Sequence, residues 1–166
     1  MKIYIIGSVA SGKSTLAKKI SDLLNIDAFA LDDVVHAPVP LGYGNTKRKE
    51  SERDAIFQSI LSQECYIIED VGRPCFSCAY PQVDQIIWLD LPKWKLKLRI
   101  ILRFLKQKLG LEHSSYHPDF KMLKMMFIWV KDSPKAQLDR LNHVIILRNK
   151  KEIQNYLSEI KNNKIY

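Results

Sequence analysis

Residues 7–15 read GSVASGKST, and the types and spacing of these residues could bind phosphate groups. Glycines allow the backbone to curl until several N–H groups point at one anion, and the N-terminus of a following helix favours negative charge there. Lys13 supplies a cation for the β- and γ-phosphates, and the hydroxyl of Ser14 is a hard ligand suited to Mg²⁺. The segment therefore predicts a P-loop (Walker A motif) that binds ATP with Mg²⁺. Its predicted nucleotide contacts are Gly7, Ser8, Val9, Ala10, Ser11, Gly12, Lys13, Ser14 and Thr15.

Acidic residues follow two apolar segments that have the pattern of strands. Asp32 and Asp33 come after one of them, and Glu69 ends the next. The carboxyl ends of parallel strands face one ligand crevice, so these carboxylates are expected beside the P-loop. We predict that Glu69 and Asp32 help Ser14 to hold Mg²⁺. Asp32 or Asp33 is predicted to bind the acceptor, orient its hydroxyl and accept its proton; for either residue alone, a helix N-cap is the alternative.

Several arginines could bind or stabilise phosphoryl groups. Arg73 follows Glu69 by four residues and could clamp a phosphate or carboxylate of the acceptor with two hydrogen bonds. Arg99 and Arg103 lie one turn apart on a predicted helix, so both could reach the transferring phosphoryl group and stabilise its charge. Arg140 is a possible further cation at this place. For the pair on the helix, a solvated face is the alternative.

Net charge and cysteine content narrow the classes of function. The chain carries a net charge of +8, and residues 91–131 hold ten Lys or Arg against two Asp or Glu, which favours a polyanionic partner such as nucleotide or nucleic acid.

Almost half of the residues are hydrophobic, which excludes a disordered chain, and no apolar run is long enough to span a membrane. Three cysteines without an export signal favour a cytoplasmic location, and Cys75 and Cys78 are expected to be buried, inert thiols.

Short apolar segments alternate with longer amphipathic ones. The predicted strands are residues 2–6, 27–31, 66–69, 85–89 and 143–147. The predicted helices are residues 14–24, 51–61, 92–108, 119–130 and 152–160. This alternation predicts an α/β fold of three layers, with a parallel sheet of five strands covered by helices on both faces. We expect one domain over residues 1–166, with an acceptor-side insertion at about 34–62 and a short lid at about 109–118.

Local signals predict several details within these elements. The Pro/Gly-rich segment at residues 36–45 is expected to be irregular. Ser51 is predicted to cap the helix that follows it, and Asp90 to cap the basic helix. Four apolar residues with helical spacing are predicted to be core: Met122, Met125, Met126 and Trp129.

The order of these features resembles that of the adenylate-kinase-like P-loop kinases. EDVGR (69–73) is similar to the D-G-x-P-R stretch of nucleoside monophosphate kinases, and RIILR (99–103) to their R-I-x-x-R. LDDVVH, the ERD of 52–54, KQKLG and KMLKMMF also resemble the bacterial family of DNA-topology modulation proteins. The resemblance implies a P-loop NTPase sheet of order 2-3-1-4-5, Arg99 and Arg103 beside the nucleotide, Arg148 near its base and Arg53 on the acceptor side.

Two functions are compatible with these features. The first is a kinase that transfers the γ-phosphoryl group of Mg-ATP to a small molecule or nucleotide. The second is a nucleotide-dependent regulator that contacts DNA through residues 93–108, although no module for reading sequence is visible, so any DNA binding is expected to be non-specific. A plain ATPase is a third possibility. No membrane partner is expected, and the chain is expected to be a monomer or a homodimer.

Overall fold

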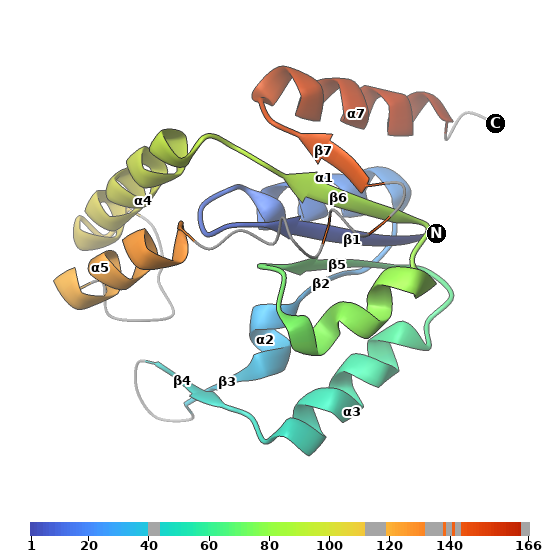
Figure 1. The fold of residues 1–166 in the computed structure, drawn as a ribbon, viewed down its shortest axis with the longest axis horizontal. Coiled ribbons are helices and arrows are strands. Elements are labelled where there is room, and N and C mark those ends of the chain that lie inside the picture. The colour runs from blue at the N-terminus through green and yellow to red at the C-terminus, as the bar shows by residue number, and fades with distance from the viewer. Residues whose placement is uncertain (40–43, 112–118, 132–137, 139–140, 142–143, 164–166) are drawn as a thin grey trace.

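Five parallel strands form the sheet at the centre of the computed structural model, which describes residues 1–39, 44–111, 119–131, 138, 141 and 144–163 (Figure 1). The strands are β1 (Lys2–Gly7), β2 (Ala28–Ala30), β5 (Tyr66–Asp70), β6 (Gln85–Leu89) and β7 (Val144–Leu147). Their order is β2-β5-β1-β6-β7. The labels differ from the predicted order 2-3-1-4-5 because a separate hairpin, β3–β4, lies between β2 and β5 in the chain. Within the parallel sheet alone the order is the predicted one.

The register of the strands brings their carboxyl ends to one edge of the sheet. Ile6 in β1 pairs with Asp70 in β5, and Gly7 pairs with Leu89 in β6. The central strands are almost continuously apolar, as expected for a parallel sheet that is buried on both faces. The P-loop, the acidic end of β5 and the start of the segment after β6 are therefore neighbours.

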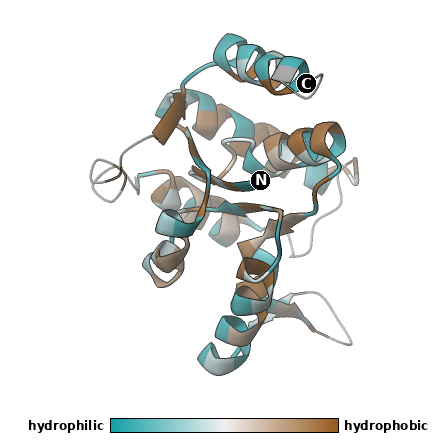
Figure 2. Cartoon of the chain, turned by 90° about the vertical axis from the view of Figure 1, so that its right-hand side faces the viewer, coloured by the Kyte–Doolittle hydropathy of each residue, from teal (hydrophilic) through white to brown (hydrophobic). Residues whose placement is uncertain are grey.

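Helices cover both faces of the sheet, which confirms the predicted three layers. The helical elements are α1 (Lys13–Leu24), α2 (Leu31–Val35), α3 (Glu50–Leu61), the 3₁₀-helix η1 (Pro74–Gln82), α4 (Lys93–Lys108), α5 (Phe120–Trp129) and α7 (Lys150–Asn163). On one face, α1 and α7 pack on the strands through residues such as Leu16 and Tyr156. Figure 2 shows α7, at the top, as a mostly hydrophilic helix, in keeping with its position on the outside of the molecule.

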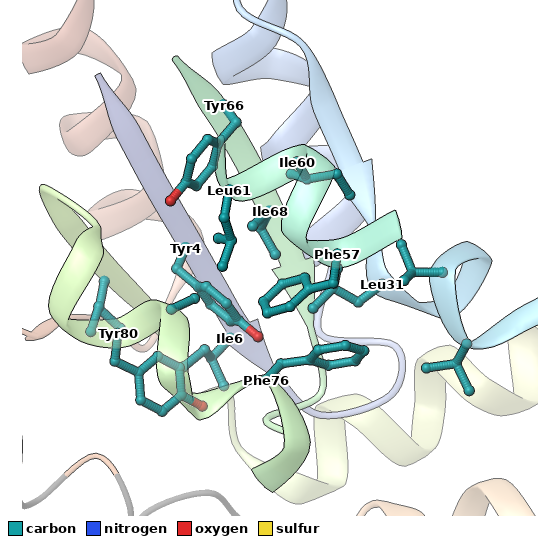
Figure 3. Packing of buried hydrophobic residues seen from close by; sticks show 14 of the residues in the cluster. Tyr4, Ile6, Leu31, Phe57, Ile60, Leu61, Tyr66, Ile68, Phe76 and Tyr80 are labelled. Carbon is teal, nitrogen blue, oxygen red and sulfur yellow. The ribbon is translucent and has the colours of Figure 1, made fainter. Parts of the chain in front are cut away.

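The other face carries an aromatic core beneath α3 and η1 (Figure 3). Phe57 of α3 meets Phe76 of η1 with ring centroids 4.6 Å apart, and Tyr4 of β1 meets Tyr80 in an edge-to-face contact at 5.2 Å. The element η1 was not predicted from the sequence. Its packing fixes the chain that leaves β5 and so supports the residues at the acidic end of that strand.

Helices α4 and α5 lie side by side and form a smaller apolar cluster of their own (Figure 1). Of the four residues predicted to be core in α5, Met126 is buried and Met122 is partly buried. The prediction is wrong for Met125 and Trp129, which are 37% and 40% exposed. The physical reason is that α5 packs along one side, against α4, so its other side stays open.

Among the residues that the structure describes, no helix is long and apolar enough to cross a membrane.

The segment predicted to be irregular, residues 36–45, begins with β3 (His36–Pro38), which pairs with β4 (Asn45–Lys47) at the far end of the segment to form a short hairpin. Two capping predictions are also wrong. Lys49, not Ser51, is at the N-cap of α3, and Pro92, not Asp90, is at the N-cap of α4. Pro92 suits this place because proline lacks the N–H that the first turn cannot satisfy.

Candidate active site

The loop after β1 has the backbone that phosphate binding requires. Gly12 has a φ of 96° and Ala10 a φ of 60°, and the N–H of Ser11 donates to the carbonyl of Ser8 at 3.2 Å. A Cβ at Gly7 would lie 2.6 Å from the Ser11 Oγ and 3.1 Å from the Leu89 Cβ, so the close approach of the loop to β6 needs glycine here. The loop therefore turns sharply from the sheet into the N-terminus of α1.

Lys13, Ser14 and Glu69 meet behind this loop. The Lys13 side chain is buried, and its Nζ donates to the Ser8 carbonyl at 3.2 Å and lies 3.9 Å from the Glu69 Oε2. The hydroxyl of Ser14 donates to the Glu69 Oε1 at 2.6 Å. The structure thus brings together three residues that were predicted from the sequence to bind the phosphates and the metal.

Burial shifts both charged groups of this trio toward neutrality. It lowers the pKa of Lys13, although the carboxylates of Glu69 and Asp32 act in the opposite direction. Burial also raises the pKa of Glu69, against the effects of Lys13 and the Ser14 hydrogen bond. A polyanion bound in the loop would favour the charged lysine, and a divalent cation would favour the charged carboxylate.

The donor set fits Mg²⁺, which prefers hard oxygen ligands and keeps several waters. The Ser14 hydroxyl and the Glu69 carboxylate are adjacent oxygens, and Asp32 is close enough to raise the pKa of Glu69. No cluster of three or more His, Cys, Asp or Glu that could hold a metal occurs within the described part of the chain. Such a site would therefore rely on the nucleotide phosphates for part of its ligands.

A second polar group lies next to the trio, around Arg73. The guanidinium of Arg73 contacts carboxylate oxygens of both Asp32 and Asp70. Asp70 also accepts hydrogen bonds from the backbone N–H groups of Gly72 at 2.8 Å and Arg73 at 2.5 Å. Burial acts to lower the pKa of Arg73, but the two aspartates outweigh it and raise this pKa. The predicted acceptor clamp is thus held between two acids.

Asp70 and Arg48 support the candidate site and were not predicted from the sequence. Asp70 is only 2% exposed, and the acid-x-x-Arg spacing with a glycine between could have indicated its pairing with Arg73. Arg48 donates to the backbone carbonyls of Asp33, Val34 and His36 and pairs with Glu52. It thereby fixes the end of α2 to the hairpin, but bonds to backbone carbonyls leave no pattern in a sequence.

The predicted acceptor residues do not all lie in this group. Asp33 is exposed on α2, next to Asp32. Arg53 on α3 pairs with Asp54 at 2.8 Å and with Glu50 at 3.7 Å, and lies over the ring of Phe76. The acceptor role of Arg53 stays a prediction.

Of the predicted lid-side arginines, Arg99 reaches the loop. Its guanidinium donates to the carbonyls of Ala10 at 3.2 Å and Ser11 at 2.9 Å. Arg103 lies one turn further along α4 and is exposed. Arg148 is exposed and its Nε lies 3.6 Å from the Asp90 carboxylate, so Asp90 contacts the segment after β7 instead of capping α4.

Arg140 lies outside the described residues, and so does most of the predicted lid at about 109–118.

The prediction of buried cysteines is wrong: Cys75 and Cys78, like Cys65, are exposed. In η1, which turns about every three residues, Phe76 and Ala79 take the inward positions and the two cysteines lie beside them on the outward side.

Neither a protein-family model nor a curated protein matches the chain. Solved structures match it over almost its whole length. A shikimate kinase from Bacteroides thetaiotaomicron is 15% identical with a TM-score of 0.57, covering 100% of this chain and 99% of that one. A shikimate kinase from Aquifex aeolicus is 17% identical with a TM-score of 0.53 and covers 99% of both chains. A gluconokinase from Sinorhizobium meliloti 1021 is 15% identical with a TM-score of 0.52, over 99% of this chain and 95% of that one. At these identities the likeness shows the fold alone: the chain shares the fold of the shikimate kinases and the gluconokinase that it matches.

Proposed function

We propose that this chain is a kinase that transfers the γ-phosphoryl group of Mg-ATP to a hydroxyl of a small molecule or nucleotide. The observation that carries the proposal is the juxtaposition of two groups at the carboxyl edge of the sheet. A buried lysine, a serine and a glutamate lie at the P-loop, and Asp32 with Arg73 lies beside them. The matched structures, which are named as shikimate kinases, a gluconokinase and a sugar kinase, support a kinase.

Each residue has a defined role in this proposal. Lys13 and the loop N–H groups bind the phosphates, and the hydroxyl of Ser14 with the Glu69 carboxylate would hold Mg²⁺. The metal, when bound, would supply charge neutralisation to the phosphate oxygens. Arg99 and Arg103 stabilise the charge on the migrating group, with Arg140 and Arg148 as further candidates on the nucleotide side.

The acceptor binds on the side of the P-loop where α2 begins. Asp32 or Asp33 orients the acceptor hydroxyl and takes its proton, with Arg73 and Arg53 as binding residues. Because Arg73 is already paired with Asp32 and Asp70, an anionic acceptor must compete with Asp32 for the guanidinium. A neutral hydroxylated acceptor can instead use the Asp32 carboxylate while that residue stays oriented by Arg73.

The test is ATP turnover with a panel of acceptors. Purified protein with Mg-ATP is incubated with neutral polyols and sugars, hydroxylated carboxylates, nucleosides or nucleoside monophosphates, and both ADP and phosphorylated product are measured. We expect a phosphorylated product with one of these classes and none from Asp33→Asn combined with Asp32→Asn. ADP and free phosphate at the same rate with every acceptor would instead establish a plain ATPase.

The closer resemblance, to the DNA-topology modulation family, remains a proposal that rests on segments such as LDDVVH. Nucleotide-dependent binding of DNA through the basic helix is the alternative function. The exposed side of α4 has leucines at its centre, which phosphate backbones do not contact favourably. We therefore expect weak, salt-dependent DNA binding, with a dissociation constant of roughly 10⁻⁴–10⁻⁶ M. A nanomolar, sequence-specific complex at physiological salt would favour the regulator.

A further inference from the structure

Helix α4 presents an apolar stripe to solvent. The stripe consists of Trp94, Leu98, Ile101, Leu102, Leu105 and Leu109, which closes the helix as its C-cap. Steps of three and four residues place these side chains on one side of the helix. None of the described residues buries them, since each keeps between 40% and 72% of its surface exposed. Contiguous apolar surface of this kind marks an interaction site more often than a solvated face.

This stripe is not a part of the core that has been left uncovered. The opposite side of α4 carries Leu96 and Ile100, which pack against Met126 and Val130 of the α5 segment. The helix therefore has two apolar sides, one used for the fold and one not. A surface helix of a globular protein ordinarily has a polar outer side.

Basic residues border the stripe on both of its edges. With about 100° of rotation per residue, Lys97 and Lys108 fall along one edge, and Lys95 and Lys106 along the other. Residues 93–108 contain seven Lys or Arg and no Asp or Glu. The surface that covers this helix must therefore be apolar in its middle and negatively charged at its borders.

Charge complementarity indicates which kind of partner could cover the apolar stripe. A second copy of the chain would bring two basic helices together, with like charges along both edges of the contact. Nucleic acid would match the lysines but would place phosphates against leucines. An anionic lipid bilayer matches both, because leucine and tryptophan enter the interface while lysine side chains extend to the headgroups.

We propose that α4 docks this protein on anionic membrane surfaces, with the apolar stripe inserted in the interface and Lys95, Lys97, Lys106 and Lys108 at the headgroups. The helix has 16 residues and would lie along the surface, not across it. Arg99 leaves α4 on another side, toward the P-loop, so docking does not withdraw it from the nucleotide site. The proposal reverses the sequence-based expectation of no membrane partner and does not depend on the proposed kinase activity.

Sedimentation with lipid vesicles tests the proposal on the full chain. Vesicles of phosphatidylcholine alone are compared with vesicles that also contain phosphatidylserine, at low and high salt. We expect binding to the phosphatidylserine vesicles that weakens with salt, and at least tenfold less binding by Leu98→Ser combined with Leu105→Ser. Ile146→Ser, which alters an exposed apolar residue of β7, is the matched control and should bind like the wild type.

Two further measurements keep the outcomes distinct. Replacing Lys95, Lys97, Lys106 and Lys108 by glutamine retains the leucines and should remove the preference for phosphatidylserine, whether or not the serine variant folds. Sedimentation equilibrium without lipid reports self-association. A dimer that the serine variant dissociates, without vesicle binding by the wild type, overturns the proposal in favour of a second copy. Absence of vesicle binding by a monomer, or equal binding by wild type and both variants, also overturns it.

Discussion

Lys13 and Glu69 are two charged groups that the fold holds out of water before any ligand is bound. Desolvation acts against both charges, and their separation of 3.9 Å offsets only part of it, because the pKa of Lys13 is lowered and that of Glu69 is raised. Each group would regain a favourable charge state on binding, the lysine beside phosphates and the glutamate near a divalent cation. The site is thus arranged for ligands that bring both kinds of charge together.

Replacing Lys13 should weaken nucleotide binding without unfolding the protein. We expect Lys13→Ala to bind Mg-ATP at least tenfold more weakly, which is ~1.4 kcal/mol or more, because the variant removes the cation that the loop directs at the phosphates. Isothermal titration calorimetry measures the affinity, and Lys18→Ala, an exposed lysine of the same helix, is the control. An unchanged affinity for Mg-ATP in Lys13→Ala would contradict the assignment.

Glu69 should make the stability of the protein depend on pH, and the sign of this dependence follows from its raised pKa. Since the raised pKa means that the folded state holds a proton more tightly than the unfolded state, stability falls as pH rises from the ordinary glutamate range through the raised value. Glu69→Gln should lack this fall in the free energy of unfolding. Urea denaturation at a series of pH values measures it, with exposed Glu64→Gln as the control. A slope that persists in Glu69→Gln would show that another group is responsible.

At the scale of elements, α4 connects the loop after β1 to the outer surface. Arg99 donates to two carbonyls of the loop, so the position of α4 influences the shape of the loop. We expect Arg99→Ala to weaken ATP binding by ~3–10-fold, about the effect of a partly exposed charge-assisted hydrogen bond, with a smaller change in kcat. Steady-state kinetics as a function of ATP concentration measure both quantities. Lys97→Ala removes the same charge from the same helix and should change neither.

Arg103 should behave differently from its neighbour. If it acts on the migrating phosphoryl group, its contribution appears in the transition state and not in ATP binding. We expect Arg103→Ala to lower kcat by ~10²–10³ while ATP affinity stays near that of the wild type. The same kinetic series measures it, once an acceptor is known. A kcat near that of the wild type would leave Arg103 as a residue of the solvated helix face.

The elements that could be predicted are those whose signals are local. The strand at residues 85–89 is apolar after its first residue, Gln85, and the P-loop has a glycine spacing that few other structures require. The features that could not be predicted depend on contacts between distant segments. Arg48 bonds to backbone carbonyls, and the buried carboxylate of Asp70 ends a strand in the same way as a solvated acid would. The exposed cysteines of η1 follow from its 3₁₀ period, which was not predicted from the sequence.

At the scale of the whole molecule, the two faces of the sheet serve different parts of the site. The face under α1 and α7 supports the helix that begins at the P-loop. The face under α3 and η1 supports the acidic end of β5, because η1 begins directly after Arg73. Aromatic packing between α3 and η1 therefore holds the proposed acceptor side in place against the nucleotide side.

A buried and an exposed aromatic residue should contribute very differently to the stability of this protein. Phe76 is fully buried and packs on Phe57, so Phe76→Ala leaves a cavity and should lower the free energy of unfolding by ~3–5 kcal/mol. Trp94 is a larger side chain but is 64% exposed on α4, and Trp94→Ala should change stability by under ~0.5 kcal/mol. Urea denaturation of both variants measures the difference. Because Trp94 belongs to the apolar stripe, a large loss of stability in Trp94→Ala would mean that the stripe serves the fold, whereas a small one leaves it available for the membrane surface.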